Sequence, residues 1–277
     1  MRFRTIRTMA ALFCGLGIVF AAGTAGAQSA DDLIPAKVRQ AGKVVIGSAI
    51  AQVPWEFYDE NQKPVGVDVD ICSGAAKSLG LEAEWVHVDF KNLIPALQAG
   101  RFDMVCAGLF ITQARAEVVN LLPYIQTGQT ILARSDFTAE VKDFADLCGF
   151  SVGLQQGSPR QALLEELSRQ CVAAGKGAID VRAFETQPIA ILALKNGQVD
   201  TFTSSDQLTA YYQQRDASLK RVVTGLSPVQ IGMAFRKDQT GLTAMFSKAL
   251  YDMRETGEYK KILEKWNIVG AGTLWLE

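Results

Sequence analysis

The sequence predicts an α/β fold in which parallel sheets are covered by helices. Two observations lead to this prediction. Short β-rich runs alternate with helical segments along almost the whole chain, and the order β-α-β-α-β restarts at residue 151. Parallel strands need long crossover connections, and helices that supply them also cover the faces of the sheet.

In the first half of the chain, apolar β-rich runs predict strands and amphipathic segments predict helices. Gly80 ends the first helix and Ala99-Gly100 ends the second, since glycine accepts the left-handed conformation that often follows a helix. We expect strands at 43–48, 81–88, 102–109 and 130–134, and helices at 69–79, 93–98 and 112–119.

The second half repeats this order. Pro159 suits the first turn of a helix, and Asn196-Gly197 ends another. We expect strands at 151–155, 179–184, 199–203 and 229–236, and helices at 159–170, 188–195, 206–214, 242–255 and 257–266.

The N-terminal segment is a predicted export signal. Three arginines fall within the first seven residues, residues 9–22 form an apolar run, and Ala25-Gly26-Ala27 supplies small residues for cleavage. The run is too short to span a bilayer comfortably, so we expect no membrane anchor. The signal peptide, residues 1–27, is expected to be cleaved after Ala27, leaving a soluble exported protein.

Composition argues against several kinds of partner and site. The chain has 28 basic and 29 acidic residues, and no basic cluster, so we expect no nucleic-acid partner. His87 is the only histidine, and its alternating neighbours predict an exposed strand residue. A His-based metal site or a Ser-His-Asp triad is therefore not expected, nor is a cofactor.

Four cysteines follow the export signal. Cys148 and Cys171 bracket one strand–helix unit, and an oxidising compartment favours a disulfide between them. Cys72 falls in a predicted helix and Cys106 in a predicted strand, so we expect both to be buried free thiols.

Two predicted helix starts have the chemistry of an anion site. Thr112 is a good N-cap, and Arg115 follows within the first turn, beside free N–H groups and the positive end of the helix dipole. This combination captures a carboxylate. In the second half, Ser158 is the predicted N-cap with Pro159 at N1 and Gln161 at N3, a capping box.

The segment 108–115 with Leu122-Pro123-Tyr124 closely resembles the "T-x-x-R … PY" signature of periplasmic solute-binding proteins, which feed amino acids to ABC importers. The resemblance extends to 66–71, 93–103 and 257–266. It implies the two-lobed periplasmic-binding-protein fold (type II), with the ligand in the cleft between the lobes. Lobe 1 would comprise 28–132 and 228–277, and lobe 2 would be inserted as 133–227, with chain crossings near 130–136 and 226–231. The aspartates Asp68, Asp70 and Asp103 are interpreted as structural, in turns and caps.

The resemblance also implies roles for single residues. Arg115 would hold the α-carboxylate of the ligand, while Gly157 and Ser158 would donate N–H bonds from the opposite lobe. Asp206 would pair with the ligand's amino group. The spacing leaves a second possibility open, in which Ser205 takes that place and Asp206 is a helix N-cap.

Position 110 departs from the amino-acid-binding pattern, because Phe110 stands where Ser or Thr is usual. The spacing of Trp55, Phe90, Phe110 and Arg115 is similar to that of the aromatic box and arginine in ectoine-binding members. Such a box suits an alkylated cation or a flat ring, although each aromatic could instead pack a lobe. Gln52 replaces an acidic residue of those members. The full set of expected ligand contacts is Gln52, Trp55, Phe90, Gly108, Phe110, Arg115, Gly157, Ser158 and Asp206.

The implied function is that of a periplasmic substrate-binding component of a polar amino-acid-type ABC importer. A monomer would close by hinge motion on a small carboxylate-bearing zwitterion, such as an amino acid or an ectoine-, betaine- or opine-like compound, and would present it to the membrane permease. The alternative is an exported cyclohexadienyl/arogenate dehydratase-like enzyme, which needs a general acid in the cleft. Glu56 and Asp206 are the candidates.

Overall fold

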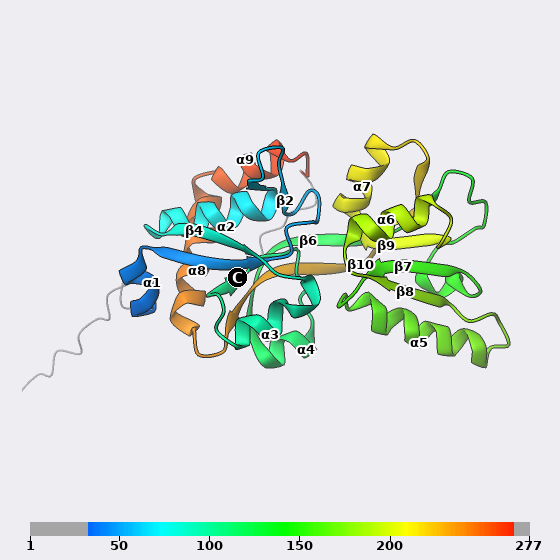
Figure 1. Cartoon of the computed structure of the whole chain (residues 1–277), viewed down its shortest axis with the longest axis horizontal. Helices are drawn as coiled ribbons and strands as arrows, with labels where there is room; N and C mark the ends of the chain where they lie inside the picture. The colour runs from blue at the N-terminus through cyan, green and yellow to red at the C-terminus, as the bar shows by residue number, and fades with distance from the viewer. Residues whose placement is uncertain (1–32, 269–277) are drawn as a thin grey trace, which may run out of the picture.

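The computed structural model describes residues 33–268, so the export signal predicted at 1–27 lies outside the described residues. Two bodies lie side by side and are joined by two long strands, β6 (Val119–Arg134) and β10 (Leu219–Arg236), as Figure 1 shows. In the described residues, no helix is long and apolar enough to cross a membrane.

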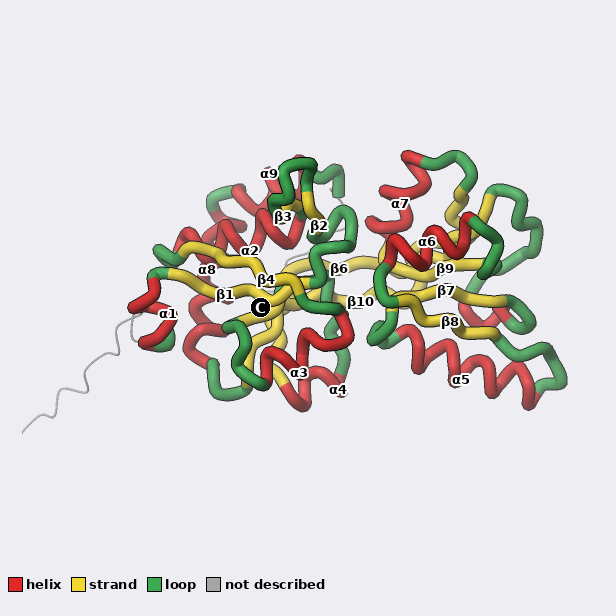
Figure 2. Tube along the Cα trace, in the orientation of Figure 1, coloured by secondary structure: helices red, strands yellow, loops and turns green. Residues whose placement is uncertain are grey.

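One sheet runs through both bodies, and Figure 2 shows its strands in yellow. Within residues 33–268 it has eight strands in the order β4-β1-β5-β10-β6-β9-β7-β8. The remaining strands are β1 (Lys43–Ser48), β4 (Glu82–His87), β5 (Met104–Val105), β7 (Ser151–Gln155), β8 (Asp180–Phe184) and β9 (Thr201–Ser205), and the hairpin β2 (Phe57–Tyr58) with β3 (Pro64–Val65) forms a small separate sheet.

The predicted α/β fold class is confirmed, but the prediction that all strands of the sheet pair in parallel is wrong. β1 pairs in parallel with β4 and β5, and β7 with β8 and β9, whereas β6 and β10 run antiparallel to each other and to their neighbours. Both long strands begin about ten residues earlier than the strands expected at 130 and 229. Pro123 lies inside β6 and interrupts the pattern from which a strand would be recognised.

Helices cover both faces of the sheet in each body (Figure 1). In the body that contains both ends of the described chain, α2 (Val67–Ser78), α8 (Thr240–Glu255) and α9 (Glu258–Lys265) enclose one core, and α3 (Leu93–Gln98) covers another. In the second body, α5 (Arg160–Ala173) covers one face, while α6 (Gln187–Lys195) and α7 (Asp206–Arg215) cover the other. Two further short helices are α1 (Ala36–Ala41) and α4 (Gln113–Val118).

These bodies correspond to the two expected lobes, and we call them lobe 1 and lobe 2. We propose to keep the boundaries expected from the sequence, with lobe 2 inserted as 133–227. The core clusters support the second crossing of this division, since Leu226 packs with lobe 2 and Val229 with lobe 1. At the first crossing, Ile131 and Leu132 already pack into lobe 2 cores.

Two disulfides are present between residues 33 and 268. Cys148 is joined to Cys171, the pairing that the sequence predicts. Cys72 is joined to Cys106, with Cα atoms 6.9 Å apart, so the prediction of two free thiols is wrong. Cys72 lies on the second turn of α2 and Cys106 directly after β5, and periodicity alone does not reveal that this helix packs over this strand end. His87 lies exposed on β4, as expected.

Candidate functional site

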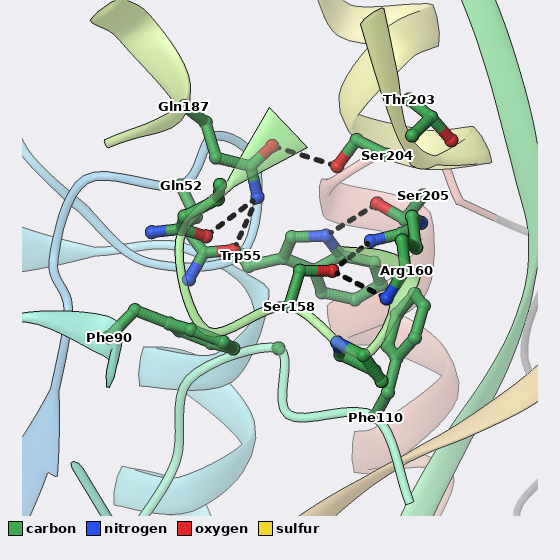
Figure 3. A pocket seen from close by; sticks show the side chains of 13 residues that line it. Gln52, Trp55, Phe90, Phe110, Ser158, Arg160, Gln187, Thr203, Ser204 and Ser205 are labelled. Atoms are coloured by element: carbon green, nitrogen blue, oxygen red, sulfur yellow. Dashed lines mark hydrogen bonds between the residues drawn. The ribbon is translucent and has the colours of Figure 1, made fainter. Parts of the chain in front are cut away.

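A small cavity lies between the two lobes, at the carboxyl ends of the parallel strands, where open α/β sheets bind ligands. The residues of its lobe 1 wall come directly after β1, β4 and β5. Those of its lobe 2 wall lie on β7 and β9 or come directly after β7 and β8. Figure 3 shows the side chains that line it. The described residues that line it are Gln52, Trp55, Phe90, Gly108, Phe110, Gln155, Ser158, Pro159, Arg160, Gln187, Thr203, Ser204 and Ser205. The cavity volume is about 20 Å³, close to the space that one water molecule needs.

Hydrogen bonds cross the cavity and hold the lobes together. Trp55 Nε1 donates to Ser205 Oγ at 3.0 Å, and Gln187 Nε2 donates to Gln52 Oε1 at 2.7 Å (Figure 3). Gln187 Oε1 also accepts from Ser204 Oγ at 2.8 Å. The structure is therefore a closed conformation, because groups from both lobes satisfy one another across the cavity.

Arg115 is positioned as the sequence predicts but lies outside the cavity lining. Thr112 caps α4, with its Oγ1 accepting from Arg115 N at 3.3 Å. The guanidinium lies 5.6 Å from the Phe90 ring centroid, and it donates to Phe110 O at 2.7 Å and to Gly157 O at 3.2 Å. Burial lowers the pKa of Arg115 to about 10, so it stays charged at neutral pH. Arg115 thus links lobe 1 to lobe 2 beside the cavity.

Gly157 also lies outside the cavity lining, at a point where the backbones of the two lobes come close together. Its φ is +81°, and an added Cβ would lie 2.9 Å from Lys91 Cα. Lys91 Nζ donates to Gln156 Oε1 at 3.1 Å in the same place. Glycine is needed here because it combines a left-handed backbone with the space that the opposite backbone requires.

Gly157→Ala is expected to disfavour the closed conformation without unfolding either lobe. The new methyl group would push against the backbone at Lys91, so small-angle scattering should give a larger radius of gyration. Gly175→Ala is the matched control, because Gly175 has a φ of +72° and open space around it. Both variants should lose about 1–2 kcal/mol of stability through backbone strain. An unchanged radius for the Gly157 variant would contradict this role.

Of the two possibilities at the end of β9, the structure places Ser205 in the cavity and Asp206 outside its lining. Ser205 caps α7, with its Oγ accepting from Leu208 N, so Asp206 is not the N-cap. Asp206 instead accepts from Thr130 Oγ1 at 2.5 Å and from Gly225 N at 3.2 Å. Its carboxylate therefore links β6 to β10, the two strands that connect the lobes.

The start of α5 differs from the expected capping box. Pro159 is at the N-cap position and the helix begins at Arg160, while Ser158 Oγ accepts from Arg160 N at 3.3 Å. Gln161 donates its side chain to Glu165 instead of reaching back to Ser158. Arg160, which was not among the expected ligand contacts, is the first residue of the helix and lines the cavity.

Arg160 is a buried cation, 7% exposed, with its guanidinium carbon 4.2 Å from the Phe110 ring centroid. Its Nη1 donates to Ser158 Oγ at 3.3 Å, whereas Nε and Nη2 have no hydrogen-bond partner among the described residues. Burial and the nearby charge of Arg115 lower the pKa of Arg160 to about 9, and Asp206 acts in the opposite direction. Arg160 is therefore still protonated at neutral pH.

Gln155, Gln187, Thr203 and Ser204 also line the cavity without having been selected from the sequence. All but Gln187 lie on β7 or β9 near the carboxyl end, so the rule for ligand sites in α/β sheets could have indicated them. Gln187 is the first residue of α6; its bond to Ser204 lies within lobe 2, whereas its bond to Gln52 depends on how the lobes meet.

Glu56 is enclosed in lobe 1 and does not line the cavity. Neither of its carboxyl oxygens has a hydrogen-bond partner among the described residues. Burial, and after it the charge of Asp68, raises the pKa of Glu56 well above its ordinary value. Asp68 is structural, but not as the turn or cap residue expected: buried in the first turn of α2, it accepts from Gly108 N and from Tyr124 Oη, both at 2.6 Å.

Glu56→Gln is expected to flatten the pH dependence of stability. A carboxyl group whose pKa is raised by folding binds its proton more tightly in the folded state. Its stabilising contribution is therefore complete below the unfolded pKa, near 4.5, and is lost as the pH rises through the folded pKa. Urea unfolding between pH 4 and 9 should show a smaller decline for Glu56→Gln than for wild type, with Asp68, whose pKa burial also raises, contributing the remainder. Parallel curves for the two proteins would contradict the argument.

The chain is similar to a known protein family. The model of the bacterial extracellular solute-binding proteins, family 3, matches residues 44–269. The ABC transporter arginine-binding protein 1 of Escherichia coli K12 is 25% identical over 232 residues, which cover 82% of this chain and 91% of that protein.

Two solved structures show the same fold. An ancestral arginine-binding protein bound to arginine is 35% identical, with a TM-score of 0.74, and the match covers 81% of this chain and 98% of that one. The ancestral amino acid-binding protein AncCDT-1, a precursor of cyclohexadienyl dehydratase, is 29% identical, with a TM-score of 0.75 and coverage of 83% and 97%. The two-lobed fold is thereby shown, and the chain belongs to the bacterial extracellular solute-binding proteins, family 3.

Proposed function

We propose that this protein is the periplasmic substrate-binding component of a polar amino-acid-type ABC importer. It captures a small zwitterion that bears a carboxylate, and it delivers that ligand to the membrane permease as a monomer. The observation that carries the proposal is the cavity between two lobes that hydrogen bonds hold closed, with polar side chains of both lobes directed into it. Cleavage after Ala27 is part of the same proposal, since the protein must be exported to meet its ligand.

Closure is proposed to occur by a hinge in β6 and β10. These strands are the sheet connections between the lobes, and their pairing is irregular between Arg221 and Val229, where register shifts interrupt it. Gly128 on β6 packs so closely that an added Cβ would lie 2.6 Å from Gly225 Cα on β10. Rotation at these positions would open the cavity and leave the core of each lobe intact.

Ligand contacts are proposed for the predicted residues on both walls. Arg115 would give its guanidinium N–H groups, which now donate to two backbone carbonyls, to the ligand carboxylate. Ser158 and the backbone at Gly157 would contact the ligand from lobe 2. Ser205, instead of Asp206, would contact the ligand's amino group. Gln52, Trp55, Phe90, Gly108 and Phe110 would form the lobe 1 wall.

A thermal-shift screen tests this function. Amino acids, betaines, ectoines and opines would be added singly to the exported protein, and a compound that binds only the folded state raises its melting temperature by mass action. At least one zwitterion should give a concentration-dependent rise, and calorimetry should then give a stoichiometry of about one. The absence of a rise across the whole panel would contradict the proposal.

The same preparation tests the dehydratase alternative. Glu56 and Asp206, the acids expected to serve such a reaction, do not line the cavity. Incubation with prephenate or arogenate is therefore expected to give no aromatic product. Product formation that scales with protein concentration would require a different assignment of the cavity.

A further inference from the structure

Arg160 is a second charged group at the cavity. The proposed function assigns the ligand carboxylate to Arg115 and gives Arg160 no role. It extends from the first turn of α5 into the cavity, beside Phe110 and Ser158 (Figure 3). Its side chain is more than nine-tenths buried, yet Nε and Nη2 have no partner among the described residues. A buried arginine that only supports the fold normally has its donors paired, since an unpaired buried charge is costly.

The charges around the cavity are not balanced. Arg160 lines the cavity and Arg115 lies beside it, over the Phe90 ring and close enough to lower the pKa of Arg160, so two guanidinium groups lie at one cleft. None of the described lining residues is Asp or Glu. Asp206 is the acid that acts on Arg160, and it is already held by Thr130 and Gly225. The cleft therefore has an excess of positive charge that its own side chains do not neutralise.

Arg160 also changes what the aromatic wall can bind. Its guanidinium lies over Phe110, and that of Arg115 lies toward Phe90. A cation–π contact of this kind occupies a ring face that a cationic ligand would otherwise use. A ligand with a guanidinium or ammonium side chain would meet a like charge at this point.

We propose that Arg160 is a specificity-determining residue which selects ligands that carry a second anionic group. The ligand class is an amino compound with two carboxylates, such as an acidic amino acid or a dicarboxylate opine. This proposal rests on the proposed binding function and assigns one carboxylate to Arg115 and the other to Arg160. Opening at the hinge admits the ligand, and the free donors of Arg160 then pair with the second carboxylate on closure.

Calorimetric titration of the exported protein tests the assignment with matched probes. L-Aspartate, L-glutamate and the opine alanopine carry two carboxylates, L-asparagine and L-glutamine are neutral analogues of similar shape, and L-arginine carries the opposite charge. At least one dicarboxylate should bind wild type at least about tenfold more tightly than the neutral analogues and L-arginine. Arg160→Gln should weaken that dicarboxylate on the order of 30-fold or more and should remove the preference over its neutral analogue.

Two further variants keep the result interpretable. Arg160→Lys retains the charge and should keep part of the preference for dicarboxylates, which also covers the case in which Arg160→Gln folds poorly. Arg169→Ala changes an exposed arginine on the same helix and should bind like wild type. Circular dichroism would verify the fold of each variant.

The outcomes separate this proposal from the function on which it rests. Tightest binding of a neutral or basic amino acid by wild type would overturn the role of Arg160 and leave the transport function standing. An unchanged dicarboxylate affinity in a folded Arg160→Gln variant would do the same. Failure of wild type to bind any of the six probes would overturn the role of Arg160, and the broader thermal-shift panel would then decide the function.

Discussion

Arg115→Ala is expected to abolish high-affinity ligand binding while leaving the protein folded. The guanidinium is mostly buried beside the cavity and joins Phe110 O in lobe 1 to Gly157 O in lobe 2. If it pairs with the ligand carboxylate, its removal leaves that carboxylate without a charged partner, at a cost of about 2–5 kcal/mol in binding free energy. Calorimetric titration with the best ligand from the thermal-shift screen would measure the loss.

The matched comparison is Arg169→Ala, which deletes an exposed arginine from lobe 2. Its affinity should stay within about 0.5 kcal/mol of wild type, the range usual for surface substitutions. Unfolding free energies would be compared in the absence of ligand, so that loss of the contact between lobes is not mistaken for loss of binding. Near-wild-type affinity in Arg115→Ala would refute the assignment of the carboxylate to this arginine.

Loss of the Cys72–Cys106 bridge is expected to produce the largest change in stability. The bridge closes a loop between positions 34 apart in sequence, and both cysteines are fully buried in lobe 1. Cross-links of this kind stabilise mainly by restricting the unfolded chain, typically by about 2–4 kcal/mol. The double variant Cys72→Ala/Cys106→Ala should therefore lower the urea midpoint.

Removal of two sulfur atoms from a core also leaves space, so a second measurement is needed. In a Cys148→Ala/Cys171→Ala background, the oxidised and reduced forms differ only in the remaining bridge. The oxidised form should be the more stable by a similar amount. Equal midpoints for the two forms would show that the bridge contributes nothing to folding stability.

Local features of the sequence predicted local features of the structure well. Thr112 caps α4 and places Arg115 in its first turn because an N-cap depends on neighbouring residues alone. The strand runs at 43–48 and 151–155 became β1 and β7 with the expected bounds, since apolar runs between turn residues leave few alternatives. Cys148 and Cys171 bracket one strand–helix unit, so their pairing could also be predicted from their positions in the sequence.

Features that depend on packing between distant segments were not predicted. Cys72 meets Cys106 because α2 lies over the end of β5, and the periodicity of neither segment contains that information. Arg160 and Phe110 meet in the cavity although they belong to different lobes, and neither local sequence indicates that contact. The capping box expected from Ser158 and Gln161 does not form, because the helix is capped at Pro159 and the Gln161 side chain bonds to Glu165.

The long strand β10 has a consequence for the order in which the protein can be assembled. In lobe 1, β5 pairs with β10 through Val105 and Ala234, so this part of the sheet lacks its neighbour until more than a hundred further residues have left the ribosome or crossed the membrane. In lobe 2, β6 pairs with β9 through residues 129–133 and 201–205, which emerge sooner. In lobe 2, β9 can therefore pair with β6 before β10, the last strand of the lobe 1 sheet, has been synthesised. The half-built lobe exposes an apolar sheet edge during this interval, and it is the stage at which a chaperone would be most needed.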